Sequence, residues 1–281
     1  MKTIVSADVG GKKISIETGR LAKQADGSVL VTAGNNMVLV TAVSSRREST
    51  LDFFPLTVEY QEKFYSTGKI PGGYFKREGR PTNNATLTAR LIDRPIRPLF
   101  PEGYRFETQV VATTLSFDGT FPLEILASIG ASAALHISDI PFAGPATSIQ
   151  VGRIDGQFVL NPSAAQLEKS DMDIIVAGTR NGIMMVEGET KFISEADAVA
   201  ALKFAHDGMR PIFGMVDELR EKTGNKAKRA FTPPKMDEAF EKQVTDFLTP
   251  KINAALRIRV KQDRYAAADA AKKEADVKFV Q

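Results

Sequence analysis

The chain has 281 residues, of which 43% are hydrophobic and 25% charged, as in an ordinary globular protein of one large or two smaller domains. It has no cysteine, which excludes disulfides, thiolate metal sites and a cysteine nucleophile, and its two histidines argue against a histidine-rich metal site. No stretch approaches the roughly 20 apolar residues of a membrane helix, and the N-terminus lacks the apolar core of a signal peptide. We therefore expect a soluble, cytoplasmic protein with no membrane partner.

The net charge of +3 is small, but the positive charge is unevenly distributed. Nine basic and only three acidic residues lie between Lys63 and Arg105, so this short segment carries the whole positive excess. A local field of this sign attracts phosphate groups even where the total charge is unremarkable. The segment is therefore the first candidate for an anion-binding surface.

Short β-branched runs between glycine turns predict hairpins in the first sixty residues, with strands near 14–16, 29–32, 38–43 and 55–60. A helix is expected from about residue 82 to 93, because Asn83 or Asn84 can cap it and Pro95 interrupts its hydrogen bonds. A strand at 109–117 follows.

A helix of small residues at 122–138 is expected to pack closely against a sheet. Two more hairpins are predicted, with turns at residues 155–156 and 180–181. Ser194 then caps a helix that runs towards Met209.

The composition changes after residue 225, where glycine disappears and alanine and charged residues dominate. Pro233, Pro234 and Pro250 punctuate helices expected at about 236–248 and 251–275. The sequence predicts an α+β domain over residues 1–210, with mixed sheets packed against helices, followed by an all-α segment over residues 211–281. The last helix has no C-terminal cap signal, so we expect a chain cut within a larger protein.

The segment from residue 69 to 81 predicts an exposed loop, because glycines and prolines fix it in irregular structure. The rings and cations at its tip are Tyr74, Phe75, Lys76, Arg77 and Arg80. Unpaired bases stack on exposed rings with about 1–3 kcal/mol per base, and the neighbouring cations neutralise the nucleic-acid backbone. The alternative is that the rings pack into the core or a neighbouring subunit.

Three arginines follow at spacings of four and three: Arg90, Arg94 and Arg97. On one helix face they repel one another unless an anion lies among them, and the forked guanidinium suits phosphate or RNA. The alternative is ion pairs with acids elsewhere in the fold or in a subunit interface. Pro95 leaves the direction of Arg97 open.

The sequence gives weaker evidence for a functional role of its other acidic residues and its histidines. Asp171 and Asp173 point the same way in an extended chain and could bind Mg²⁺, but acids are common where a strand begins, and we favour a structural role. His136 and His206 are expected to be packing or surface residues. The phosphate-loop, nucleophile-elbow and dinucleotide-binding glycine motifs do not occur.

The opening of the chain, with residues 25–29 and 34–43, resembles the RNase PH fold family. Three longer segments resemble the first of the two RNase PH-type domains of the bacterial polynucleotide phosphorylase family: 52–60, 73–81 and 88–100. The resemblance covers essentially the whole chain, including the helical linker that follows this domain.

The resemblance implies a homotrimeric ring that degrades single-stranded RNA from its 3′ end with inorganic phosphate, releases nucleoside diphosphates and uses Mg²⁺ in its second domain. The loop at residues 74–77 would line the constriction that RNA enters; Tyr74 and Lys76 depart from the family's usual Phe and Arg but keep a stacking face and a charge. Degradosome partners such as a helicase and an endonuclease are a further expectation.

The resemblance also implies that this copy is not the catalytic one. The catalytic copy has an Asp, a second Asp six residues later and a Lys two beyond it, and only the second is matched, by Asp173. The other two positions fall on Leu167 and Ile175, and the phosphate-binding turn falls on residues 122–124. Because leucine and isoleucine neither bind a metal nor transfer a proton, we expect no catalytic residue and no metal in this chain.

The hypothesis is therefore the N-terminal part of a phosphorolytic 3′-to-5′ exoribonuclease, which guides RNA and builds the ring but is inactive by itself. One alternative is a standalone, non-catalytic ring protein that binds RNA. Another is an active single-domain exonuclease resembling RNase PH itself, against which the missing Asp and Lys argue.

Overall fold

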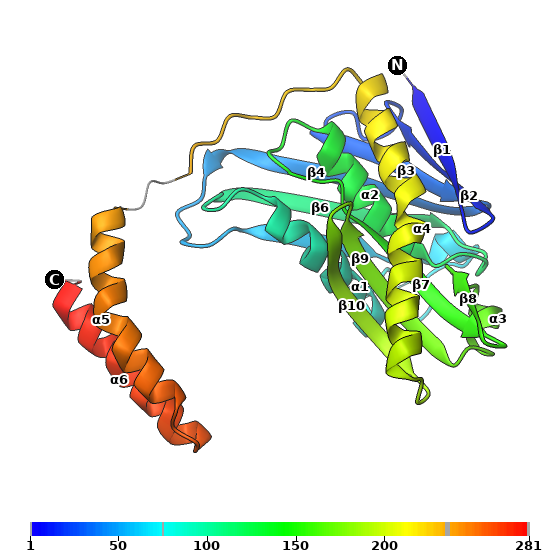
Figure 1. Ribbon diagram of the computed structural model, residues 1–281. Helices are drawn as coiled ribbons and strands as arrows, with labels where there is room; N and C mark the ends of the chain where they lie inside the picture. Colours follow the sequence, from blue (N-terminus) through cyan, green and yellow to red (C-terminus); the bar gives the residue numbers. More distant parts are fainter. Residues whose placement is uncertain (1, 75, 234–236, 280–281) are drawn as a thin grey trace. The chain divides into compact units, whose positions relative to one another are not determined.

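The computed structural model describes residues 2–74, 76–233 and 237–279, and the chain divides into two compact units, Met1–Thr232 and Pro233–Gln281. The first unit combines two β-sheets with helices, and the second contains helices (Figure 1). The predicted α+β fold class, with an all-α segment after it, is confirmed.

The larger sheet of the first unit has six strands in the order β1-β2-β3-β4-β6-β5. Their bounds are β1 (Thr3–Val9), β2 (Lys12–Thr18), β3 (Gly27–Ala33), β4 (Asn36–Glu48), β5 (Leu56–Gln61) and β6 (Phe106–Ser116). Neighbours are antiparallel except for β5 and β6, which are parallel. A parallel pair needs a crossover connection, and this crossover contains the loop and the helix that carry the candidate residues.

The smaller sheet has four antiparallel strands in the order β10-β9-β7-β8. Their bounds are β7 (Thr147–Ile154), β8 (Gln157–Leu160), β9 (Met172–Thr179) and β10 (Gly182–Thr190). The single-turn helix α3 (Ala164–Leu167) connects β8 to β9. The two hairpins predicted in this region are both present.

Helix α2 (Leu123–Ile137) lies at the centre of the unit and contacts strands of both sheets. All of its residues except Glu124 are buried. A Cβ atom on Gly130 would overlap Val40 Cγ2 and lie 3.1 Å from Val31 Cγ2. The small residues of this helix therefore allow the close packing that the sequence predicts.

Helix α1 (Asn83–Ile96) begins and ends differently from the prediction. Its cap is Thr82, whose Oγ1 accepts a hydrogen bond from the Ala85 N–H, and not Asn83 or Asn84. It also continues through Pro95 and leads into the short 3₁₀ helix η2 (Arg97–Leu99). The proline removes one hydrogen bond, but the buried side chains of the last turn hold the helix in place.

Helix α4 (Glu195–Lys222) extends thirteen residues beyond Met209, and the first unit reaches Thr232 instead of residue 210. The reason is that buried apolar side chains continue at helical spacing after Pro211, among them Ile212, Val216 and Leu219. Beyond the helix, residues 224–232 stay attached to the first unit through Lys228 and Arg229.

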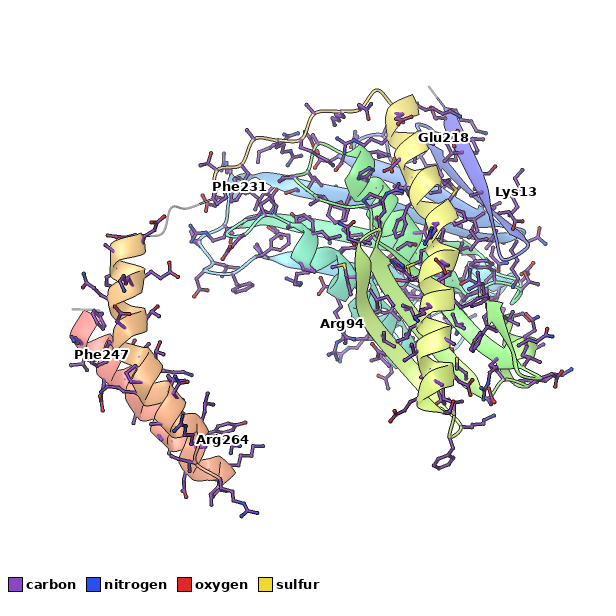
Figure 2. The ribbon with its side chains drawn as sticks, viewed as in Figure 1. Lys13, Arg94, Glu218, Phe231, Phe247 and Arg264 are labelled. Atoms are coloured by element: carbon purple, nitrogen blue, oxygen red, sulfur yellow. The ribbon has the colours of Figure 1, made fainter. Side chains whose placement is uncertain are left out.

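The second unit pairs helix α5 (Glu238–Leu256) with helix α6 (Lys261–Phe279). Pro250 lies inside α5 and does not separate two helices as predicted; the break falls after Leu256. The helices meet through an ion pair of Lys251 with Glu274 and through Phe247, labelled in Figure 2, whose ring centroid is 5.5 Å from that of Phe279. In the described part of the chain, none of the helices combines the length and the apolar character needed to cross a bilayer.

Candidate functional site

Residues 69–74 and 76–81 contain no helix or strand and are mostly exposed, as the sequence predicts for the loop before α1. Tyr74 is 94% exposed, so its ring does not pack into the core of the unit. The cations predicted for this loop are exposed as well: Lys76, Arg77 and Arg80. Phe75, the other predicted ring, lies outside the described residues.

The loop starts from a firmly held 3₁₀ turn, η1 (Phe64–Thr67). The Phe64 N–H donates to Glu78 Oε1 over 3.0 Å, which keeps the start and the end of the loop close together. The Phe117 N–H donates to the Ser66 carbonyl over 2.8 Å and joins the turn to the end of β6. The exposed segment between them is therefore supported at both ends.

Arg97 is held within the fold. Its guanidinium forms two hydrogen bonds with the carboxylate of Asp93 and donates to the backbone carbonyls of Phe54 and Leu56. Four of the five guanidinium N–H groups are thus used to fasten the end of α1 to the start of β5. This arrangement favours the alternative of an internal ion pair for Arg97.

The other two arginines of α1 are exposed. Arg94, labelled in Figure 2, forms an ion pair with Glu187 of β10, with Nη1 and Oε2 2.8 Å apart. Both partners are about half exposed, so the pair contributes little stability and can exchange for another anion. Arg90 makes no ion pair with any described residue. These two arginines can therefore still meet a phosphate.

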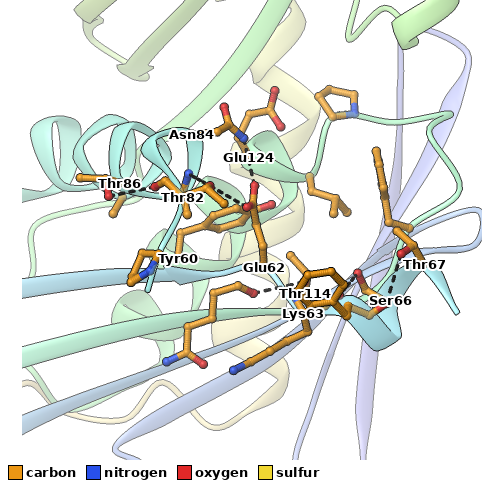
Figure 3. Close-up of a pocket in the computed structure, with 18 of the residues that line it drawn as sticks. Tyr60, Glu62, Lys63, Ser66, Thr67, Thr82, Asn84, Thr86, Thr114 and Glu124 are labelled. Atoms are coloured by element: carbon orange, nitrogen blue, oxygen red, sulfur yellow. Dashed lines mark hydrogen bonds between the residues drawn. The ribbon is translucent and has the colours of Figure 1, made fainter. Parts of the chain in front are cut away.

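A pocket of about 850 Å³ opens beside the loop (Figure 3). Its walls come from β5, η1, the end of the loop, the first turns of α1 and α2, and α3. Glu62 accepts hydrogen bonds from Thr82 Oγ1 (2.7 Å) and Asn84 Nδ2 (3.0 Å), so its carboxylate is fixed at the N-terminus of α1. The volume is typical of small-molecule binding sites.

Three polar side chains from different elements line the pocket: Tyr60 and Gln150, which are buried, and Glu124, which is partly buried. Burial raises the pKa of Glu124, and the negative charges of Asp173 and Glu62 raise it further. Burial, followed by Glu124 and Glu62, also raises the pKa of the Tyr60 phenol. Gln150 Nε2 donates to Asp173 Oδ1 over 2.7 Å, whereas its Oε1 is buried without a hydrogen-bond partner among the described residues. Hydrogen-bond acceptor atoms therefore predominate in this part of the pocket, which we call its inner end.

Leu167, which the family resemblance predicts at a catalytic position, lines this pocket. Ile175, the other such residue, lies on β9 and packs against the hydrophobic core. Asp173 accepts the hydrogen bond from Gln150, while Asp171 pairs with Arg153, and that hydrogen bond lowers the pKa of Asp171. Within the described ranges, no group of three or more Asp, Glu or His side chains is placed to hold a metal ion.

Both histidines have structural partners. His136 Nε2 lies 3.1 Å from Asp217 Oδ1; burial, and then the charges of Arg220 and Lys228, lower its pKa to about 4. His206 Nε2 lies 2.9 Å from the Thr179 carbonyl. Neither imidazole lines the pocket, in line with the packing roles expected from the sequence.

Sequence reasoning did not single out Tyr60, Glu62 or Gln150 as members of a site. Glu124 entered only as part of residues 122–124, the positions that correspond to the phosphate-binding turn of the family's catalytic copy. The one signal available was that an acidic residue, Glu62, lies two positions after a predicted strand and precedes the basic loop. No spacing in the sequence connects it with Gln150.

Two family models match consecutive parts of the first unit: domain 1 of the 3′ exoribonuclease family over residues 10–141, and domain 2 of the same family over residues 144–208. The chain belongs to the 3′ exoribonuclease family, and the predicted RNase PH resemblance is confirmed.

Among curated relatives, the chain is 70% identical over 276 residues to the polyribonucleotide nucleotidyltransferase of Bdellovibrio bacteriovorus, covering 98% of this chain and 40% of the relative. It is 50% identical to the enzyme of that name from Anaeromyxobacter dehalogenans, covering 96% of this chain and 37% of the relative. The chain is 49% identical to the polyribonucleotide nucleotidyltransferase of Geotalea uraniireducens, covering 96% of this chain and 39% of the relative. The chain thus spans about two fifths of the length of these relatives and matches the N-terminal part.

Proposed function

We propose that this chain is the N-terminal part of a polyribonucleotide nucleotidyltransferase, a cytoplasmic enzyme that degrades single-stranded RNA with inorganic phosphate to nucleoside diphosphates. The observation that carries the proposal is the 70% identity over 98% of the chain to a relative of that name. The same identity does not favour a standalone RNA-binding ring protein. In this proposal a second copy of the domain supplies catalysis and binds Mg²⁺, and a helicase or an endonuclease can join as degradosome partners.

The chain's own part is to guide RNA and to build a homotrimeric ring. The exposed ring of Tyr74 offers a stacking face, and the exposed cations around it offer contacts to phosphate: Lys76, Arg77 and Arg80. Arg90 and Arg94 extend this basic surface along α1, and Phe75 belongs to the same proposal by sequence. Arg97 supports the surface by holding the end of α1.

The double variant Lys76→Ala/Arg77→Ala is expected to bind single-stranded RNA at least tenfold more weakly than the wild type at low salt. Each lost phosphate contact also lowers the slope of log K against log salt by about 0.7, so the double variant should lose about 1.4. Fluorescence anisotropy with labelled oligoadenylate over a salt series measures both quantities.

The matched control for this experiment is Lys13→Ala/Lys203→Ala, which removes the same charge from exposed positions on β2 and α4. This control should keep the affinity and salt slope of the wild type to within about twofold. Equal losses in the two double variants would mean that only net charge matters, and the guiding role of the loop would be wrong.

The chain alone is expected to release no nucleoside diphosphate from poly(A) in the presence of phosphate and Mg²⁺. The reason is that Leu167, which lines the pocket, is the residue that the family resemblance predicts at the position of a catalytic Asp, and a leucine can neither bind a metal nor transfer a proton. Chromatography of the products measures this, with the full-length Bdellovibrio enzyme as positive control. Release that Asp173→Asn abolishes would come from this chain and would contradict the prediction.

A further inference from the structure

The inner end of the pocket beside the loop, around Glu124 and Gln150, does not have the chemistry of a phosphate site. Glu124 stands in the first turn of α2, where the helix N-terminus would otherwise attract an anion. The pKa of its carboxyl is raised by burial and then by Asp173 and Glu62, and no cation contributes to the shift. A phosphate at the inner end of the pocket would therefore meet like charges and no basic partner.

The inner end of the pocket instead favours a ligand that donates hydrogen bonds. Gln150 is only 3% exposed, lines the pocket, and has a buried Oε1 without a partner among the described residues, whereas its Nε2 is already used by Asp173. The carboxylate of Glu124 receives no side-chain hydrogen bond from the residues that the structure describes. An unmade hydrogen bond of this kind is costly in a buried position, so a ligand with N–H donors would be bound favourably.

The outer part of the pocket has a different character. Two aromatic side chains line it while remaining partly exposed, Phe64 at 44% and Phe117 at 39%. Three cations line it as well: Lys63, Lys69 and Arg80. Aromatic rings stack on nucleobases, and lysine and arginine bind phosphate. The pocket therefore combines acceptors within, rings on the wall and cations further out, in a volume of about 850 Å³.

We propose that this pocket binds a nucleotide whose base carries an exocyclic amino group, with the amine donating to Glu124 and Gln150 and the phosphate lying among Lys63, Lys69 and Arg80. Cytosine, adenine and guanine have such an amine, whereas uracil has a carbonyl oxygen in the same place and would turn lone pairs towards these acceptors. The nucleotide is either free or the terminal residue of an RNA chain. The site shares Arg80 with the loop but does not include Tyr74, Lys76 or Arg77, and it does not depend on RNA binding at those three residues.

Isothermal titration of the 281-residue chain with CMP and UMP tests the proposal, because the two ligands differ only in the donor and acceptor groups of the base edge. CMP is expected to bind at least tenfold more tightly than UMP. Glu124→Gln keeps the shape of the side chain but turns one acceptor into a donor, and it should bring the ratio close to one. Gln150→Met should also lower the ratio of CMP affinity to UMP affinity. Because two different variants are tested, the failure of one of them to fold does not leave the proposal untested.

The control is Glu189→Gln, which changes an exposed carboxylate on β10 that does not line the pocket and should leave the ratio unchanged. Oligonucleotides that end in C or U form the second arm; discrimination with these but not with free nucleotides would identify RNA ends as the source of the ligand. Equal binding of both bases in both arms, or no saturable binding below about 1 mM, would overturn the proposal.

Discussion

Arg229→Met is expected to lower the free energy of unfolding of the first unit by about 3 kcal/mol. Arg229 Nη2 lies 2.7 Å from Asp26 Oδ1 and 2.9 Å from Asp139 Oδ1, and all three side chains are only about 15% exposed. Methionine fills a similar volume but leaves two carboxylates together, with the more exposed Arg46 as their main remaining partner. Urea unfolding followed by the circular dichroism of the β-sheet measures the loss.

The effect should also depend on pH in a defined direction. Burial raises the pKa of Asp139, but the hydrogen bond and charge of Arg229, with Lys226 and Arg46, outweigh burial, so the net pKa lies below its usual value. A depressed carboxyl pKa contributes stability above the unfolded value of about 3.9, and this is lost as the pH falls through the folded pKa. The difference between wild type and Arg229→Met should therefore be full at pH 7 and shrink below about pH 4.

An exposed ion pair provides the control. Arg210 lies 2.9 Å from Asp207 on α4, with both side chains well exposed, so Arg210→Met should change the stability by less than about 0.5 kcal/mol. If the two arginine variants were equally stable at pH 7, the ion pairs of Arg229 with Asp26 and Asp139 would not hold residues 224–232 on the first unit as their geometry indicates.

The strands and the central helix could be predicted because their signals are local. Alternation of β-branched residues between glycine turns marks β3 and β4, and a run of small residues marks α2. Helix ends were less predictable, and prolines were the reason. Pro95, Pro211 and Pro250 all lie inside helices. At Pro95 and Pro211, the packing of buried apolar side chains on both sides outweighs the loss of one hydrogen bond.

In the candidate site, too, some features could be predicted from the sequence and others could not. The exposed basic loop could be predicted from its composition, since glycine, proline and charge are local properties. The partner of Arg94 is Glu187, 93 positions further along the chain, and spacing within α1 carries no information about it. The pocket likewise brings together Tyr60, Glu124 and Gln150 from β5, α2 and β7. Such a site follows from tertiary packing, which a single sequence does not reveal.

Gly27→Ala is expected to lower the free energy of unfolding by about 3 kcal/mol, at the upper end of the usual cost of overpacking a core. A Cβ atom at this position, the first residue of β3, would overlap the carbonyl oxygen of Ala134 and lie 2.9 Å from its carbonyl carbon. These are backbone atoms of α2, which is buried between the sheets, so the contact cannot be relieved by rotating a side chain. Urea unfolding of the purified chain measures the change.

Gly214→Ala makes the same chemical change where nothing lies within 4 Å of the added atom, on an exposed turn of α4. Alanine favours a helix over glycine by up to about 1 kcal/mol, so this control should raise the stability. The two substitutions therefore have opposite expected signs, and local propensity alone would predict a gain for the helical one and no large penalty for the other. Equal stability of Gly27→Ala and wild type would mean that α2 does not approach β3 so closely, and the buried position of the helix beneath the pocket would need another explanation.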